Sequence, residues 1–156
     1  MQYYCVYNSD MLKIHAERYA EMLRKQGLKV TPQRLQLISL LAQLKKPMSA
    51  HEIKAKWAVG TIDTVTLYRA LDALVDTSIV RRVHLQHGHA DYELIVRGEH
   101  HHHLVCTHCG TLEDVAGCPA GNMEKSALKN SSKFASLREH SLEFFGTCRT
   151  CAVYSN

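Results

Sequence analysis

The spacing of apolar residues in the first half of the chain predicts amphipathic helices. Residues 11–26 fit one such helix, and Gly27 follows it where a helix C-terminus favours glycine. Thr31 and Pro32 then fit the N-cap and first position of a second helix, because proline needs no backbone N–H donor there. The chain therefore begins with two helices joined by a short turn.

Two further helix starts are visible before residue 64. Ser49 and Glu52 have the spacing of a capping box, in which each side chain bonds the backbone N–H of the other residue. Asp63 fits the N-cap of a fourth helix. The apolar face expected for this fourth helix consists of Leu67, Leu71, Leu74 and Val75.

Alternating polar and apolar residues replace the helical pattern after the fourth helix. Residues 79–85 and 91–96 alternate as strands do, and the loop 86–90 between them carries Gly88 at its middle. Helices followed by a two-stranded hairpin are typical of a winged helix, a variant of the helix-turn-helix. We therefore expect residues 1–96 to form a winged-helix domain preceded by a helix.

The fourth helix offers side chains suited to DNA on the face turned away from its apolar residues. Helical phase places Thr66 and Arg69 on that face and Tyr68 at its edge. Arginine can bond guanine edges, and a threonine methyl or tyrosine ring can pack on a thymine methyl. A protein-interaction module could carry the same pattern, because a fold does not dictate its function.

Composition and charge support a folded protein with two dissimilar halves. The 156 residues are 46% hydrophobic and 22% charged, as in globular domains, and no apolar run reaches membrane-spanning length. The first ten residues lack a signal-peptide pattern, so we expect a cytoplasmic protein. Residues 1–85 have a net charge of +6 and residues 86–156 one of −2, which indicates a basic front half suited to nucleic acid.

Four cysteines in the second half form two CxxC pairs, Cys106/Cys109 and Cys148/Cys151. Two such pairs can complete a tetrahedral four-thiolate site, which suits zinc. Such a closed site has no open coordination position, so we expect it to stabilise the fold rather than to catalyse. A redox CxxC is the alternative, but it leaves the second pair unexplained. The long segment between the pairs predicts intervening strands and a helix.

Four consecutive histidines, residues 100–103, directly precede the first CxxC pair. On a strand, His101 and His103 would share one face and His100 and His102 the other, so each face could offer two imidazoles to a different metal. A solvated polar strand is the simpler alternative. The residues that could supply further ligands are Glu93, Asp114, Glu124, His140, His87 and His89.

The remaining cysteines and histidines carry weaker signals. Cys5 and Cys118 have no CxxC partner, and we expect both to be structural. Single histidines outside the run are expected to be ordinary surface residues; they are His15, His51, His84 and His108.

The order of these motifs resembles the ferric uptake regulator (Fur) family. The resemblance is carried by residues 27–34, 66–71, 100–110, 140–142 and 146–151, which extends it over nearly the whole chain. It implies an α+β fold, with an N-terminal winged helix-turn-helix and a small C-terminal α/β dimerisation domain with structural zinc. On this basis we expect domains at residues 1–96 and 97–156, and a homodimeric, metal-dependent repressor that binds a palindromic operator in double-stranded DNA.

The resemblance also assigns residues. It places Tyr68 and Arg69 on the recognition helix and implies DNA contacts for Lys29 and Arg34. The four CxxC cysteines match the family's structural zinc site. The regulatory site is implied at Glu93, His101, His103 and Asp114.

One expected regulatory ligand is missing, because Pro47 and Met48 occupy the place where the family carries a histidine before its third helix. We expect His89 to replace it, with His51 and His87 as less favoured substitutes. A third metal site is implied at His100, His102, Glu124 and His140.

The resemblance leaves the signal open between a divalent metal (iron, zinc or manganese) and peroxide, the last because Asp114 resembles the peroxide-sensing branch. It implies a regulator rather than an enzyme. Two other classes remain as alternatives, a histidine-rich metalloenzyme and a zinc-stapled protein-interaction adaptor. The metalloenzyme would need an open metal position, a general base and a substrate cleft, none of which the sequence shows.

Overall fold

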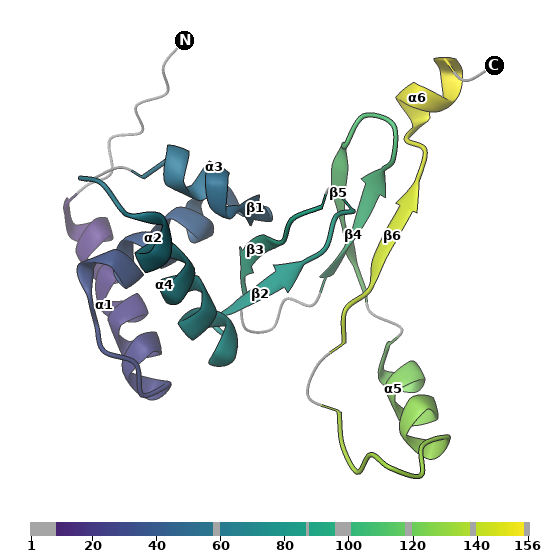
Figure 1. Cartoon of the computed structure of the whole chain (residues 1–156), viewed down its shortest axis with the longest axis horizontal. Coiled ribbons are helices and arrows are strands. Elements are labelled where there is room, and N and C mark those ends of the chain that lie inside the picture. The colour runs from purple at the N-terminus through teal and green to yellow at the C-terminus, as the bar shows by residue number, and fades with distance from the viewer. Residues whose placement is uncertain are drawn as a thin grey trace. The chain divides into compact units, whose positions relative to one another are not determined.

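The computed structural model describes residues 9–57, 60–86, 88–95, 101–117, 120–137 and 140–154. The expectations for Cys5, His87, His100 and Cys118 therefore fall outside the described residues. The chain divides into two compact units, Met1–Ile95 and Val96–Asn156. Each unit has its own sheet (Figure 1).

The helices of the first unit begin where the sequence predicts caps. Thr31 accepts the Arg34 N–H at the start of the second helix, and Asp63 accepts the Thr66 N–H at the start of the fourth. Ser49 and Glu52 form the complete capping box. The four helices are α1 Ser9–Lys25, α2 Pro32–Leu44, α3 Ala50–Ala55 and α4 Thr64–Asp76.

The predicted hairpin is present as β2 (Val80–Val83) and β3 (Asp91–Leu94), which pair antiparallel. Gly88 in the connecting loop has a φ of +78°, a conformation that glycine adopts without strain. A two-residue strand, β1 (Met48–Ser49), pairs with the other edge of β3 and was not predicted. The sheet order is thus β1-β3-β2, which with α3 and α4 gives the expected winged helix.

The hydrophobic core of the first unit is continuous. It joins residues of α1, α2, α3 and α4 to residues of the β1-β3-β2 sheet. The predicted face of α4 is buried at Leu67, Leu71 and Leu74. Burial of these side chains fixes the rotation of α4 about its axis and so determines which residues point outward.

The second unit contains β4 (His101–Cys106) between β5 (Leu112–Ala116) and β6 (Glu143–Gly146), with β5 antiparallel and β6 parallel to it. Helices α5 (Ala120–Lys129) and α6 (Arg149–Tyr154) complete it. Strands and a helix thus lie between the two CxxC pairs, as predicted. In the described part of the chain, no helix is long and apolar enough to cross a membrane.

Candidate metal centres and nucleic-acid interface

The two CxxC pairs meet at one end of the second unit. The Sγ atoms of Cys106, Cys109, Cys148 and Cys151 all lie within 4.8 Å of one another, and those of Cys109 and Cys148 are 3.7 Å apart. Tetrahedral zinc with Zn–S bonds of about 2.3 Å requires sulfur atoms about 3.8 Å apart. The four thiols therefore fit zinc, and the chain is built to hold it as a structural cofactor.

Hydrogen bonds within the cluster shift the pKa values of three thiols in different directions. The backbone amides of Cys148 and Cys109 point at the Cys106 sulfur and lower its pKa to about 6. Thr111, through its side chain and backbone, lowers the pKa of Cys109. The neighbouring Cys109 and Cys148 side chains raise the pKa of Cys151 to about 12. Cys106 is thus the readiest of these thiols to lose its proton, and a bound cation would displace the proton of Cys151.

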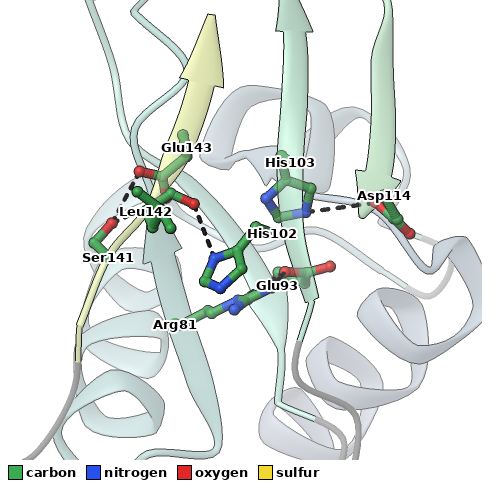
Figure 2. A network of polar contacts seen from close by, with 8 residues as sticks. All are labelled: Arg81, Glu93, His102, His103, Asp114, Ser141, Leu142 and Glu143. Atoms are coloured by element: carbon green, nitrogen blue, oxygen red, sulfur yellow. Dashed lines mark hydrogen bonds and ion pairs between the residues drawn. The ribbon is translucent and has the colours of Figure 1, made fainter. Parts of the chain in front are cut away.

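A second group of metal-binding side chains occupies the middle of the second sheet. His101 and His103 share one face of β4, as alternation predicts, with their ring centroids 5.3 Å apart. The Nε2 atom of His103 lies 3.6 Å from Oδ1 of Asp114 on β5 (Figure 2). Two ligand atoms bound to one ion at about 2.1 Å would be about 3.0–3.4 Å apart, so a small movement suffices for shared coordination. His103 is almost fully buried, whereas Asp114 is half exposed.

The expected ligands of the first unit are Glu93, on β3, and His89, in the loop that precedes this strand. Glu93 has a side chain 6% exposed and forms an ion pair with Arg81 of β2. The Nε2 atom of His89 lies 3.9 Å from Oδ1 of the buried Asp91. Met48, at the place of the missing family histidine, is completely buried in the core. This position therefore contributes an apolar side chain to the core and no imidazole or carboxylate.

A third group lies on the other face of β4. The Nδ1 atom of His102 is 2.9 Å from the carbonyl oxygen of Leu142 (Figure 2). The Nδ1 atom of His140 is 2.6 Å from Oε1 of Glu124. A carbonyl or carboxylate oxygen accepts, so Nδ1 donates in both rings and Nε2 is the nitrogen suited to a metal. The rings of His102 and His140 lie 5.4 Å apart. Glu124 therefore orients His140 in this structure.

The outward face of α4 carries the predicted DNA-reading side chains. Tyr68 is 45% exposed, and Thr66 and Arg69 are also exposed. The guanidinium of Arg34 on α2 donates to the Lys29 carbonyl oxygen, so these two residues lie together near the start of that helix. The structure thus presents two groups of DNA-binding candidates within the basic first unit.

Two contacts of these sites were not predicted from the sequence. Arg81 was not singled out, although its position directly opposite Glu93 follows once the hairpin register is known. The carbonyl oxygen of Leu142 carries no sequence signal at all. Of the isolated histidines, His51, His84 and His108 are exposed as expected, whereas His15 is partly buried and its ring stacks on Tyr19.

Comparison with known proteins supports the fold described above and identifies the family of the chain. The model of the Ferric uptake regulator family matches residues 25–145. The ferric uptake regulation protein of Legionella pneumophila is 31% identical over 135 residues, which covers 85% of this chain and 97% of that protein.

Solved structures agree with this match. The Vibrio cholerae ferric uptake regulator aligns with a TM-score of 0.61 and 32% identity, over 83% of this chain and 98% of that one. The Helicobacter pylori ferric uptake regulator aligns with a TM-score of 0.66 and 26% identity, over 90% of this chain and 93% of that one. The fold, the four-thiolate cluster and these matches together show that the chain belongs to the ferric uptake regulator family of metal-responsive transcriptional regulators.

Proposed function

We propose that this protein is a cytoplasmic, homodimeric repressor that binds a palindromic operator in double-stranded DNA when a divalent metal fills its regulatory site. The observation that carries the proposal is the separation of two ligand chemistries in the second unit. One end holds four thiols, and the middle of the sheet holds imidazoles with a carboxylate. Thiolates suit a permanent zinc, whereas imidazole and carboxylate ligands suit an exchangeable ion.

The regulatory ligands that we propose are His101, His103 and Asp114 together with Glu93, and His89 in place of the missing family histidine. The contacts within each unit support this set. His103 already lies beside Asp114 and His101, and the buried Glu93 carboxylate, which pairs with the Arg81 guanidinium here, is an anionic oxygen ligand suited to a divalent cation.

We propose a third site that uses the Nε2 atoms of His102 and His140, with His100 as a further ligand. The Glu124 carboxylate orients His140 there, and it could also ligate the ion after a side-chain movement. The hydrogen bonds to both Nδ1 atoms support this proposal, because ligating histidines are commonly held by such a contact. The H. pylori relative has three functional metal binding sites.

Metal binding would act on DNA binding by shifting a conformational equilibrium. A metal held by ligands from both units favours the arrangement in which those ligands converge, and its effect is limited by its difference in affinity between arrangements. In a dimer, this arrangement would set two recognition helices about 34–36 Å apart, or a multiple of that. The V. cholerae relative undergoes a structural rearrangement of its DNA-binding domains, which supports such a mechanism.

The residues that we propose to contact DNA divide into two roles. Arg69, Tyr68 and Thr66 on the outward face of α4 would read base edges, because arginine bonds guanine and the other two pack on thymine methyls. Lys29 and Arg34 would contact phosphates or the groove edge. The basic charge of the first 85 residues supports both roles.

The metal identity that we propose is iron, zinc or manganese. Imidazole and carboxylate ligands accept all three, and affinities measured in the test tube follow the Irving–Williams order rather than cellular supply. Asp114, which resembles the residue of the peroxide-sensing branch, adds peroxide as an alternative signal.

The decisive experiment is a DNA-binding titration after chelation. The zinc-loaded protein is stripped of exchangeable metal, and Fe²⁺, Mn²⁺ or Zn²⁺ is restored separately under anaerobic conditions with a palindromic duplex. We expect salt-dependent, sequence-specific binding only after one of these ions is restored. Specific binding that is equal with and without metal contradicts the proposal, and absence of any duplex binding would favour the adaptor alternative.

A further inference from the structure

A charged pair spans the two strands of the hairpin in the first unit. Arg81 of β2 and Glu93 of β3 are directly opposite each other in the antiparallel register. The guanidinium donates twice to the same carboxylate oxygen, from Nε at 2.8 Å and from Nη2 at 2.6 Å, both to Oε2 (Figure 2). The Glu93 side chain is 6% exposed and that of Arg81 is 27% exposed.

A buried carboxylate requires compensation of its charge. Moving a carboxylate out of water is costly unless a cation and hydrogen-bond donors replace the lost hydration. Here the guanidinium supplies both, with short, charge-assisted bonds. A divalent metal ion at the same carboxylate would supply the same compensation. The guanidinium and the metal are therefore alternative counter-ions for Glu93, and two cations beside one carboxylate repel each other.

We propose that Arg81 competes with the regulatory metal for the Glu93 carboxylate. In the metal-free protein, Arg81 neutralises Glu93 and holds the hairpin together; on metal binding, the ion takes over the carboxylate and the guanidinium withdraws. This inference rests on the proposed role of Glu93 as a regulatory ligand. Arg81 thus raises the metal concentration at which the site fills, without contacting the metal itself.

The chain offers a matched control on the same strand. Arg82, the next residue of β2, points to the other face of the sheet and pairs with Asp72 of α4, where both side chains are about half exposed. Arg81→Gln and Arg82→Gln remove the same charge from neighbouring positions, but only the first releases Glu93. Arg81→Lys keeps a positive charge and loses the two-donor fork, so it tests the same contact with less risk to folding.

The probe is Co²⁺ alone, titrated into protein whose four-thiolate site is filled with zinc. Binding is followed by the ligand-field absorption of Co²⁺. Thiolate charge-transfer bands must be absent, because they would show Co²⁺ bound to the cysteines. We expect Arg81→Gln to bind Co²⁺ about tenfold more tightly than the parent, which corresponds to about 1.4 kcal/mol of competition removed. Arg82→Gln should bind as the parent does, and Arg81→Lys should show a smaller tightening. Without metal, Arg81→Gln should unfold at a lower temperature than the parent, and Co²⁺ should close that gap.

Glu93→Gln separates failure of this inference from failure of the proposed site. If Glu93→Gln binds Co²⁺ as tightly as the parent, Glu93 is not a ligand and both claims fall. If Glu93→Gln weakens binding but neither Arg81 variant tightens it, the competitor role alone is wrong. The inference also requires that Arg81→Gln gives no tightening in the Glu93→Gln background. Tightening there would reveal a general charge effect and overturn the inference, and so would equal tightening by Arg82→Gln.

Discussion

Replacing Cys151 with serine removes one of the four thiols that converge at the end of the second unit. Cys151 lies on the short helix α6, where its backbone N–H donates to the Cys148 sulfur. Serine keeps the size and polarity of the side chain, so the substitution acts mainly on metal coordination. We expect the variant to lose its tightly held zinc, because a hydroxyl is a poor zinc ligand beside three thiolates.

The consequence for stability is large because the described part of the second unit buries few apolar side chains. The large continuous core lies wholly in the first unit, and the buried apolar residues described in the second unit are Val105 and Cys106. A structural zinc site has an apparent binding free energy of about 10–16 kcal/mol. Whole domains are stable by about 5–15 kcal/mol. We therefore expect loss of zinc to unfold the second unit and, with it, most of the proposed dimer, and to leave the first unit folded on its own core.

The assay combines metal analysis with thermal unfolding and sedimentation. The parent should hold one tightly bound zinc per chain, and Cys151→Ser should hold none and lose the transition of its second unit. Cys5→Ser is the control, because it removes a thiol that has no CxxC partner. If Cys151→Ser retains its zinc, its dimer and its unfolding profile, zinc is not what holds the second unit together.

Three further predictions concern the first unit. Arg69→Ala should weaken specific operator binding by about 1–3 kcal/mol and leave the metal content unchanged; equal affinity in a fluorescence anisotropy titration would remove Arg69 from base reading. Ser49 lowers the pKa of Glu52 from its usual 4.5 by donating its backbone N–H and hydroxyl, so the carboxylate stabilises the fold above that pH. Glu52→Gln should cost roughly 0.5 kcal/mol near neutral pH, a modest figure because the side chain is exposed, and this cost should vanish in urea titrations as the pH falls through the lowered pKa. His89→Ala should weaken binding of the regulatory metal in a calorimetric titration of zinc-loaded protein, and an unchanged affinity would mean that His89 does not replace the missing family ligand.

The sequence predicts the local features of the first unit because they depend on neighbours in the chain. The caps at Thr31, Ser49 and Asp63 each use a side chain and a backbone N–H three residues further on, so spacing alone reveals them. The four-thiolate cluster was also predictable, because each CxxC turn already places two thiols side by side and two such turns complete the site. Strand β1 was not, because a two-residue strand exists only through its pairing with β3.

Most hydrogen-bond and ion-pair partners of the candidate ligands could not be predicted from the sequence. His102 bonds the carbonyl of Leu142, which lies 40 residues away in the chain and carries no distinguishing side chain. The contact of Arg81 with Glu93 depends on the hairpin register, which the length of the loop and its turn decide. Contacts of this kind are set by tertiary pairing, so residue type and spacing indicate which side chains can bind metal but not what holds them.

The measurement that tests the account most directly compares two double variants in operator binding with and without restored metal. His101→Ala with His103→Ala removes both imidazoles from one face of β4, and His102→Ala with His140→Ala removes two from the other face. In a fluorescence anisotropy titration, the first pair should abolish metal-dependent DNA binding and retain one zinc and the dimer, whereas the second pair should have a milder effect. If the His101/His103 variant with its zinc intact still binds the operator in response to metal as the parent does, this face of β4 is not the sensing site.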